Sequence, residues 1–389
     1  MNILYYTWQE ITCDDVFDTL KNIGNNVTKL EYELKNNLLD AKFVNHIENL
    51  LDKGYAGEAY DCILSCNFIP LISKVAWRNK IKYISWCFDS PCITLYSDMV
   101  YNPYNYIFHF DSYEVNRLKN VGVKHAYHMP LAVNTKRVGE LIYKNQHIYN
   151  SDITFMGNLY NNIINFDNIY NKLDDYLKGK MDAILDVNEL FYGMELIDEL
   201  VDKSLMEDIN KCINFTHIDE MNIDNKEIVK NILAKKISGN DRIRLIKLIS
   251  EKYKLTLYTT SYIQSMYNVC NNGPLDYYNK MPIVFYNSKI NINITIRSIR
   301  RGIPLRAMDI MGAGGFLLSN YQQELNELFV DREDLVLFHN DEDMMDKIEY
   351  YLSHEKEREE IAVNGQEKIR ELHDYRNTWE KIFAICEFE

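Results

Sequence analysis

Paired cysteines, an excess of basic charge and long apolar runs are all missing from this sequence. The eight cysteines are scattered, without a C-x-x-C pair or a histidine at metal-ligand spacing, which argues against a zinc site and favours reduced thiols. The formal net charge of -14 argues against a nucleic-acid-binding protein, because such proteins present a basic face to the phosphates. No run approaches the roughly 20 apolar residues of a membrane span. We therefore expect a cytoplasmic protein with no membrane span, no nucleic-acid partner and no metal.

The chain contains enough apolar residues to form hydrophobic cores, since 47% of its 389 residues are hydrophobic and 26% are charged. A chain of this length exceeds what one core usually serves, so two domains are expected. Strand-like runs alternate with helical patterns, such as that at residues 41–53, which is typical of a doubly wound, mostly parallel α/β sheet. The strand-like runs lie at residues 1–7, 26–32, 60–65, 81–88 and 106–110.

A polar stretch at residues 144–152 separates this alternation from a new strand at 153–156, and we place a domain boundary there. We expect an N-terminal domain over residues 1–150 and a C-terminal domain over residues 151–375. The second domain contains a helical insertion at about 165–252, after which strands return. We expect these later elements as strands at 254–258, 292–296 and 315–319, a helix at 341–353, and a final helix, 376–389, that packs back toward the N-terminal domain.

The most informative segment covers residues 292–319, INITIRSIRRGIPLRAMDIMGAGGFLLS. A strand leads through a loop with Pro304 into a short helix that carries Arg306 and Asp309. A glycine-rich turn at 312–315 then leads into another strand. Glycines there let the helix end pack tightly against that strand and leave backbone atoms close to a ligand.

This segment resembles the donor-site helix of GT-B glycosyltransferases, with aspartate at position 309 where many relatives carry glutamate. More narrowly, the chain resembles the CgeB-type spore-maturation glycosyltransferase-like family. The resemblance implies a GT-B fold, in which two Rossmann-like domains face a cleft, with a helical insertion in the second domain and C-terminal helices. The further matching runs are WCFDSP (86–91), HMPLAVN (128–134), DITFMGNLY (152–160) and YYLSHEKEREEIAVNGQEKI (350–369), all in the expected order.

The resemblance also implies that the second domain binds a nucleotide sugar. Asp309 would hold the ribose hydroxyls, and Arg306 and Arg297 would hold the diphosphate; the alternative for each is a surface residue. Arg301 stands where many relatives carry a second glutamate, and an arginine there would neutralise a diphosphate or an acidic sugar. The other implied ligands are Gly157, Asn158, Tyr258, Gly273, Pro274, Leu275, Gly312, Gly314 and Gly315, with a simple turn as the alternative for 273–275.

A base that takes the proton from the acceptor hydroxyl is expected in the first domain. Asp89 follows the strand at 81–88 and is the first candidate, with a turn or helix cap before Pro91 as the alternative. No metal is expected, because this fold stabilises the leaving diphosphate with a helix N-terminus and basic side chains. The remaining candidates for the base are Glu10, His109 and Asp111.

The leading functional hypothesis is a hexosyltransferase that uses a nucleotide sugar, with a UDP-sugar favoured. Its acceptor would be a cytosolic protein, such as a spore-coat or flagellar component, or a glycan. No cofactor beyond this co-substrate is expected, and a homo-oligomer is compatible with the sequence. Two alternatives stay open: a catalytically silent module that binds a nucleotide sugar or a protein, and a sugar-nucleotide epimerase, which would need acids on both faces of the sugar.

Overall fold

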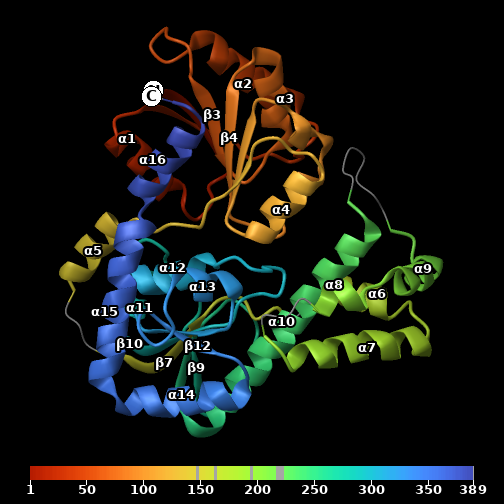
Figure 1. Cartoon of the computed structure of the whole chain (residues 1–389), viewed down its shortest axis with the longest axis vertical. Helices are drawn as coiled ribbons and strands as arrows, with labels where there is room; N and C mark the ends of the chain where they lie inside the picture. Colours follow the sequence, from red (N-terminus) through yellow and green to blue (C-terminus); the bar gives the residue numbers. More distant parts are fainter. Residues whose placement is uncertain (146–148, 162–163, 193–195, 216–222, 389) are drawn as a thin grey trace. The chain divides into compact units, whose positions relative to one another are not determined.

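The computed structural model describes residues 1–145, 149–161, 164–192, 196–215 and 223–388. The chain divides into two compact units, each built around one parallel β-sheet. The first unit consists of residues 1–134 and 372–388, and the second of most of residues 135–371 (Figure 1). All eight cysteines are unpaired, and six of them are buried.

Six parallel strands form the sheet of the first unit, in the order β2-β1-β3-β4-β5-β6. Every residue of β1 and β3 is buried, as expected for apolar strands of a parallel sheet that is covered on both faces. The strands are β1 (Asn2–Thr7), β2 (Asn26–Glu31), β3 (Cys62–Cys66), β4 (Lys82–Cys87), β5 (Asn105–His109) and β6 (Ala126–His128). The helices are α1 (Cys13–Asn22), α2 (Ala41–Lys53), α3 (Pro70–Asn79), α4 (Ser112–Asn120) and α16 (Tyr375–Ile385).

The C-terminal helix α16 completes the core of the first unit. Trp379 is fully buried, and its ring meets that of Trp86 on β4 edge-on, with 5.3 Å between the ring centroids. Lys82 Nζ donates to the carbonyl oxygen of Cys386 (2.6 Å), and α16 also lies against α1. The end of the chain is therefore part of the unit that its beginning forms.

The sheet of the second unit is also parallel, in the order β12-β11-β10-β7-β8-β9. The chain begins at the centre with β7, adds β8 and β9 on one side, and then returns to the centre to add β10, β11 and β12 on the other side. The strands are β7 (Ser151–Met156), β8 (Leu255–Tyr258), β9 (Val269–Asn271), β10 (Ser288–Asn293), β11 (Leu317–Asn320) and β12 (Val336–Phe338). The helices around them are α5 (Thr135–Tyr143), α11 (Met281–Tyr286), α12 (Leu305–Gly312), α13 (Gln323–Leu328), α14 (Asp341–Ser353) and α15 (Glu355–Leu372).

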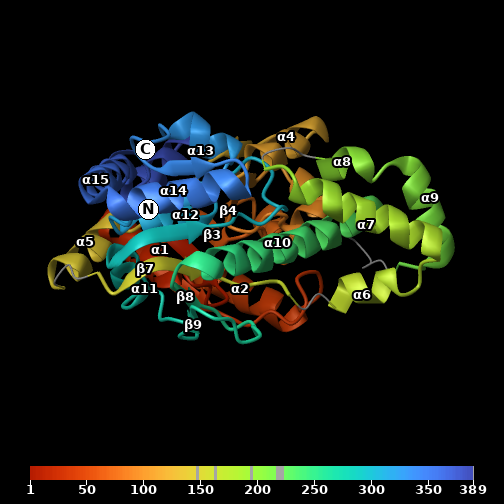
Figure 2. The ribbon, with the colours of Figure 1, turned by 90° about the horizontal axis from the view of Figure 1, so that it is seen from below.

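A helical insertion lies between β7 and β8 of the second unit. Its helices surround the N-terminal half of α10, as Figure 2 shows, and share a hydrophobic cluster that includes Met181, Leu205 and Leu233. The C-terminal half of α10 instead buries Leu245 and Ile249 in the cluster of the sheet. One 28-residue helix thus belongs to both clusters. The helices are α6 (Ile164–Tyr170), α7 (Asp175–Glu189), α8 (Leu196–Leu200), α9 (Lys203–Cys212) and α10 (Asn225–Lys252).

The two parallel sheets confirm the predicted α/β alternation, but the strand predicted at 292–296 is misplaced. In the structure β10 covers Ser288–Asn293, and three of its buried residues, Ser288, Asn291 and Asn293, are polar. Asn291 Nδ2 donates to the carbonyl oxygen of Phe285 (3.0 Å), and Asn293 Nδ2 donates to Ser319 Oγ (2.9 Å), so the amide nitrogens of both residues have acceptors inside the unit. Across the ranges given above, no helix is both long and apolar enough to cross a membrane.

Candidate functional site

The strand orders locate the candidate sites, because doubly wound sheets bind ligands beyond the carboxyl ends of their strands, where the order reverses. In the second unit this reversal lies between β7 and β10, which are neighbours in the sheet although strands β8 and β9 lie between them in sequence. In the first unit it lies between β1 and β3. The residues that follow these strands are therefore the first to consider.

Arg242, on α10, joins the two loops that flank the reversal in the second unit. Its guanidinium donates to the carbonyl oxygen of Asn158, after β7, and from Nη2 to the carbonyl oxygen of Ile294, after β10 (2.6 Å). The loop after β7 also approaches α10 closely, since a Cβ on Gly239 would lie 2.3 Å from the carbonyl oxygen of Tyr160. Backbone contacts from both loops therefore fix Arg242 at the reversal.

Arg242 and Arg306 bring two guanidinium groups to this region, and the charge of the nearby Asp309 acts on Arg306. Neither forms an ion pair with any residue that the structure describes, and Arg306 Nη1 donates to the sulfur of Met281 (3.3 Å). Burial, together with the nearby charge of Arg306, lowers the pKa of Arg242 to about 10, and burial also lowers the pKa of Arg306. Because a guanidinium keeps its charge at neutral pH and presents a fork of N–H donors, the pair suits a multivalent anion.

Asp309 lies three residues after Arg306 on α12, and therefore on the same face of that helix. The buried Tyr277 donates from its hydroxyl to Asp309 Oδ1 (3.1 Å), which orients the carboxylate. A carboxylate accepts hydrogen bonds from vicinal hydroxyl groups, whereas the two cations attract phosphate oxygens. The cluster thus combines groups that suit both the sugar and the diphosphate of a nucleotide.

Three of the predicted ligands, Gly157, Asn158 and Tyr258, lie together at the same edge of the sheet. Gly157 follows β7 with a φ of 149°, and its N–H donates to the carbonyl oxygen of Tyr258 (3.1 Å). Asn158 Oδ1 accepts from the N–H of Tyr160 (2.7 Å) and from the hydroxyl of Ser261 (3.1 Å). The structure therefore places these residues beside the reversal, and their contact with a ligand stays a prediction.

The predicted base-binding segment, residues 273–275, follows β9. Gly273 has a φ of 76°, and its N–H donates to Asn271 Oδ1 (3.0 Å), so the segment begins with a tight turn. It then leads to Tyr277, whose hydroxyl holds Asp309. Chain continuity thus links this segment to the cluster on α12.

The glycine-rich turn closes the C-terminal end of α12. The N–H of Gly314 donates to the carbonyl oxygen of Met311 (2.8 Å), and that of Gly315 donates to Ile310 (2.9 Å), which is the bond pattern of a Schellman cap. A Cβ on Gly315 would lie 2.7 Å from a backbone oxygen of α11, and Gly312 is buried. Capping and packing account for these glycines, and their predicted contact with a ligand gains no support.

Arg297 and Arg301, also predicted as phosphate ligands, lie on the loop after β10. Arg297 Nε donates to Asp241 Oδ2 of α10 (2.9 Å), and Arg301 Nη2 lies 3.5 Å from Glu327 Oε1. The guanidinium of Arg297 is already paired with a buried carboxylate, so the diphosphate role gains no support for this residue. For Arg301 it stays a prediction.

In the first unit, Glu10 follows β1 at the strand reversal. Burial raises the pKa of Tyr5 well above its usual value, so this hydroxyl keeps the proton that it donates to Glu10 Oε1. Glu10 Oε2 accepts from the hydroxyl of Thr7 (2.7 Å) and from the N–H of Trp8 (3.2 Å). The Glu10 carboxylate therefore shapes the turn after β1.

The other candidates for the base lie at the ends of β4 and β5. The N–H of Asp111 donates to His109 Nδ1 (3.0 Å), so His109 Nε2 carries the ring proton and donates to the carbonyl oxygen of Asp89 (3.1 Å). Asp111 is buried and caps α4 by accepting from the N–H of Tyr113 (3.0 Å). Asp89 is exposed, and its Oδ2 accepts from Asn67 Nδ2 (2.7 Å). Among these candidates, Asp89 is the carboxylate that solvent reaches.

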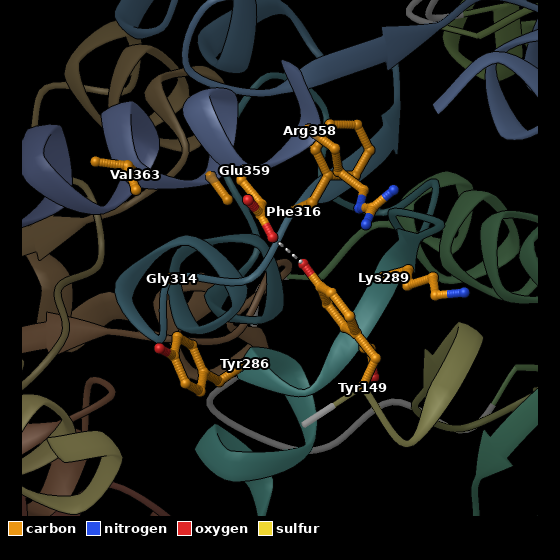
Figure 3. Close-up of a pocket in the computed structure, with 10 residues that line it drawn as sticks. Tyr149, Tyr286, Lys289, Gly314, Phe316, Arg358, Glu359 and Val363 are labelled. Atoms are coloured by element: carbon orange, nitrogen blue, oxygen red, sulfur yellow. Dashed lines mark hydrogen bonds between the residues drawn. The ribbon is translucent and has the colours of Figure 1, made fainter. Parts of the chain in front are cut away.

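A separate cavity of about 240 Å³ lies at the amino ends of the strands in the second unit (Figure 3). On its wall, Arg358 donates to the carbonyl oxygen of Tyr351 (2.6 Å), and Tyr149 donates to Glu359 Oε1 (3.2 Å). These polar groups bind one another at the edge of the sheet opposite the strand reversal. Within the described part of the chain, no group of three His, Cys, Asp or Glu side chains is placed to hold a metal ion.

Comparisons with known proteins point to the same region. Residues 242–384 match the model of a family described as glycosyl transferase-like, and this segment includes Arg242, Arg306 and Asp309. The chain has the GT-B fold of glycosyltransferases. Together the family match and this fold support a glycosyltransferase. A search of curated protein sequences finds no significant match.

Three solved structures illustrate the likeness, each at low sequence identity. An α-glucosyltransferase in complex with UDP and DNA has a TM-score of 0.53 at 11% identity, over 98% of both chains. The Anabaena protein HepE in complex with UDP has a TM-score of 0.50 at 9% identity, over 99% of both chains. Sucrose-phosphate synthase of Thermosynechococcus elongatus has a TM-score of 0.50 at 10% identity, over 98% of this chain and 99% of the other. These likenesses establish the GT-B fold.

Arg242 and Tyr277 are the two members of the cluster that the sequence analysis missed. Arg242 sits in an amphipathic helical pattern, where a cation normally indicates a solvated face. Tyr277 is one of 29 tyrosines, and its partner Asp309 is 32 residues away. Only the fold brings the two residues to the carboxyl edge of the sheet.

Proposed function

We propose that this protein is a CgeB-type glycosyltransferase that moves a hexose from a UDP-sugar to a protein or glycan acceptor in the cytoplasm. The observation that carries the proposal is the cluster at the strand reversal of the second unit, where the unpaired cations Arg242 and Arg306 accompany the oriented carboxylate of Asp309. A nucleoside diphosphate supplies the complementary groups, a doubly charged anion and a pair of ribose hydroxyls.

The proposed donor chemistry needs negative charge to be stabilised as the bond to the diphosphate breaks. Arg242 and Arg306 provide two fixed positive charges, and α12 begins immediately before Arg306. Preorganised cations of this kind stabilise a leaving diphosphate, so we propose a reaction that proceeds without a metal ion. Asp309 would accept hydrogen bonds from the ribose hydroxyls and fix the orientation of the donor.

The proposed acceptor chemistry needs a base for the attacking hydroxyl. We assign this role to Asp89, because its carboxylate is exposed and is oriented by Asn67, whereas Asp111 and Glu10 are committed to local structure. The hydroxyl oxygen would attack the anomeric carbon while its proton passes to Asp89. Two of the similar structures contain UDP, which supports a uridine nucleotide as the donor carrier.

The test is titration calorimetry of the full chain with UDP, GDP and CDP in buffer that contains EDTA. We expect UDP to bind, and we expect Arg242→Met and Asp309→Ala each to weaken binding about tenfold or more, which corresponds to about 1.4 kcal/mol. Arg376→Met is the matched control, because Arg376 belongs to the first unit and forms an exposed pair with Glu380. Unchanged affinity in both cluster variants would remove the proposed donor site.

Turnover is tested separately, by following release of UDP from UDP-hexoses in the presence of protein and glycan acceptors. We expect UDP release that depends on an added acceptor and persists in EDTA. Tight binding of UDP without turnover of any UDP-hexose would instead identify a nucleotide-sugar-binding module.

A further inference from the structure

The loop between β10 and α12, residues 294–304, is held by the helical insertion. This loop leads from the strand at the reversal to the helix that carries Arg306 and Asp309. Two of its arginines, Arg297 and Arg300, are largely buried and pair with carboxylates on α10 and α8. These two contacts connect the insertion to the proposed donor site.

The first contact centres on Asp241 of α10, whose side chain is 0% exposed. Arg297 Nε donates to Asp241 Oδ2 (2.9 Å), and the N–H of Arg297 donates to Ser238 Oγ (2.8 Å). Arg297 Nη1 also donates to the carbonyl oxygen of Phe191 (2.6 Å), and its guanidinium lies over the ring of Tyr192. Main chain and side chain of one loop residue are thus both bound by the insertion.

The second contact centres on Asp198 of α8. Arg300 Nη2 donates to Asp198 Oδ1 (3.0 Å), and Lys230 Nζ of α10 lies 2.5 Å from the same oxygen. Only 9% of the Arg300 side chain is exposed, so water competes little for this pair. Together the two contacts form a clamp that holds the loop at Arg297 and Arg300.

We propose that the insertion positions the donor site, with Asp241 and Asp198 as positioning residues for the loop that leads into α12. The inference rests on the proposed function, because it assigns the insertion to nucleotide binding. A ligand binds more weakly when its binding must first order a loop that has no regular structure. Pairing Arg297 and Arg300 in advance removes that cost before a nucleotide arrives.

Helix α10 links this clamp directly to Arg242 at the strand reversal. Asp241, which holds the loop, and Arg242, which faces the strand reversal, are consecutive residues of this helix. The N-terminal half of α10 is packed into the insertion, and its C-terminal half is packed on the sheet. A single rigid element therefore sets the position of both the loop and Arg242.

The experiment compares full-length Asp198→Asn and Ser238→Ala with the wild type. Asp198→Asn removes the negative charge that pairs with Arg300, Ser238→Ala removes the hydroxyl that accepts from the N–H of Arg297, and both leave Arg242, Arg306 and Asp309 intact. Asp208→Asn is the matched control, because Asp208 pairs with Lys211 on the insertion surface and has no contact with the loop. Asp198→Glu tests rescue by retaining the charge.

Hydrogen exchange of a peptide that covers residues 295–304 reports on the clamp, and calorimetric titration with UDP reports on its consequence. We expect exchange in this peptide to become about tenfold faster in Asp198→Asn and Ser238→Ala, and the Kd for UDP to rise about threefold to tenfold. The control should match the wild type in both measurements, and Asp198→Glu should recover part of the UDP affinity.

The outcomes separate this inference from the proposed function. Unchanged exchange in both variants overturns the clamp, whether or not UDP binds. Faster exchange with an unchanged Kd for UDP also overturns the inference, because the loop would then be held for a purpose other than nucleotide binding. Absence of UDP binding by the wild type defeats the proposed function, and the positioning role falls with it.

Discussion

Four side chains at the carboxyl edge of the first sheet are candidates for the base, and they differ in their hydrogen bonds and in their exposure. The carboxylate of Glu10 accepts from Thr7 and from the backbone of Trp8, and Asp111 caps α4. The ring nitrogens of His109 are bound to backbone groups on both sides. Asp89 is distinguished by its exposure, which lets an acceptor hydroxyl reach its carboxylate.

At this scale we predict that Asp89→Asn separates binding from chemistry. The amide keeps the size of the side chain but cannot take a proton, so transfer should fall by about 10²-fold to 10⁴-fold. The Kd for UDP should be unchanged, because Asp89 belongs to the first unit and the nucleotide cluster to the second. Calorimetry and acceptor-dependent UDP release measure the two effects. A fully active variant would show that another group accepts the proton.

Single elements also differ in how tightly they constrain their residues, and the cap of α12 leaves no room for a side chain at Gly315. At Gly315 a Cβ would lie 2.7 Å from the carbonyl oxygen of Phe285 and 2.8 Å from Asn291 Nδ2. Gly139, on α5, has no heavy atom within 4 Å of the position that a Cβ would take. A glycine-to-alanine substitution therefore meets a crowded site at Gly315 and open space at Gly139, within one unit.

We predict that Gly315→Ala lowers the free energy of unfolding by about 1–3 kcal/mol, because the added methyl group forces its backbone neighbours apart. Gly139→Ala should be neutral or should raise the free energy of unfolding by up to about 1 kcal/mol, since alanine is the better helix former. Urea titration followed by circular dichroism measures both variants. Equal effects from the two substitutions would contradict the packing assigned to the cap.

Elements with a regular apolar pattern and a local cap were predictable from the sequence. Helices were predicted at 41–53 and 341–353, and α2 and α14 have these bounds. Asp40 and Asn340 cap them by accepting from backbone N–H groups three residues later. Local sequence contains both signals, so tertiary structure was not needed to find these helices.

The misplaced strand and the incomplete site depended on contacts that are distant in sequence. Asn291 makes the β10 segment look polar, although its amide nitrogen finds an acceptor in the backbone of α11. Arg297 was predicted to bind phosphate, but its partner Asp241 lies 56 residues earlier, on the insertion. The helix that carries Arg306 and Asp309 was predictable because its residues are contiguous. Arg242 was not, because only the fold brings it to the strand reversal.

At the scale of the whole molecule, the contribution of α16 to the first unit is open to a direct test. Trp379 is fully buried against Trp86, whereas Trp77, on α3 of the same unit, is 52% exposed. We predict that Trp379→Ala lowers the free energy of unfolding of the first unit by about 3–5 kcal/mol, because it leaves a large cavity. Trp77→Ala should cost under about 1 kcal/mol. Denaturant titration with tryptophan fluorescence compares the two, and similar losses would contradict the core role of α16.

Membership of α16 in the first unit has a consequence for synthesis of the protein. A ribosome releases residues in order, and domains that are continuous in sequence can fold as they emerge. Here the strands around Trp86 emerge early, but Trp379 follows only after the whole second unit has been made. During synthesis, part of the apolar core of the first unit therefore stays exposed until α16 has been made. A chain that stops before α16 keeps that apolar surface exposed to chaperones and proteases.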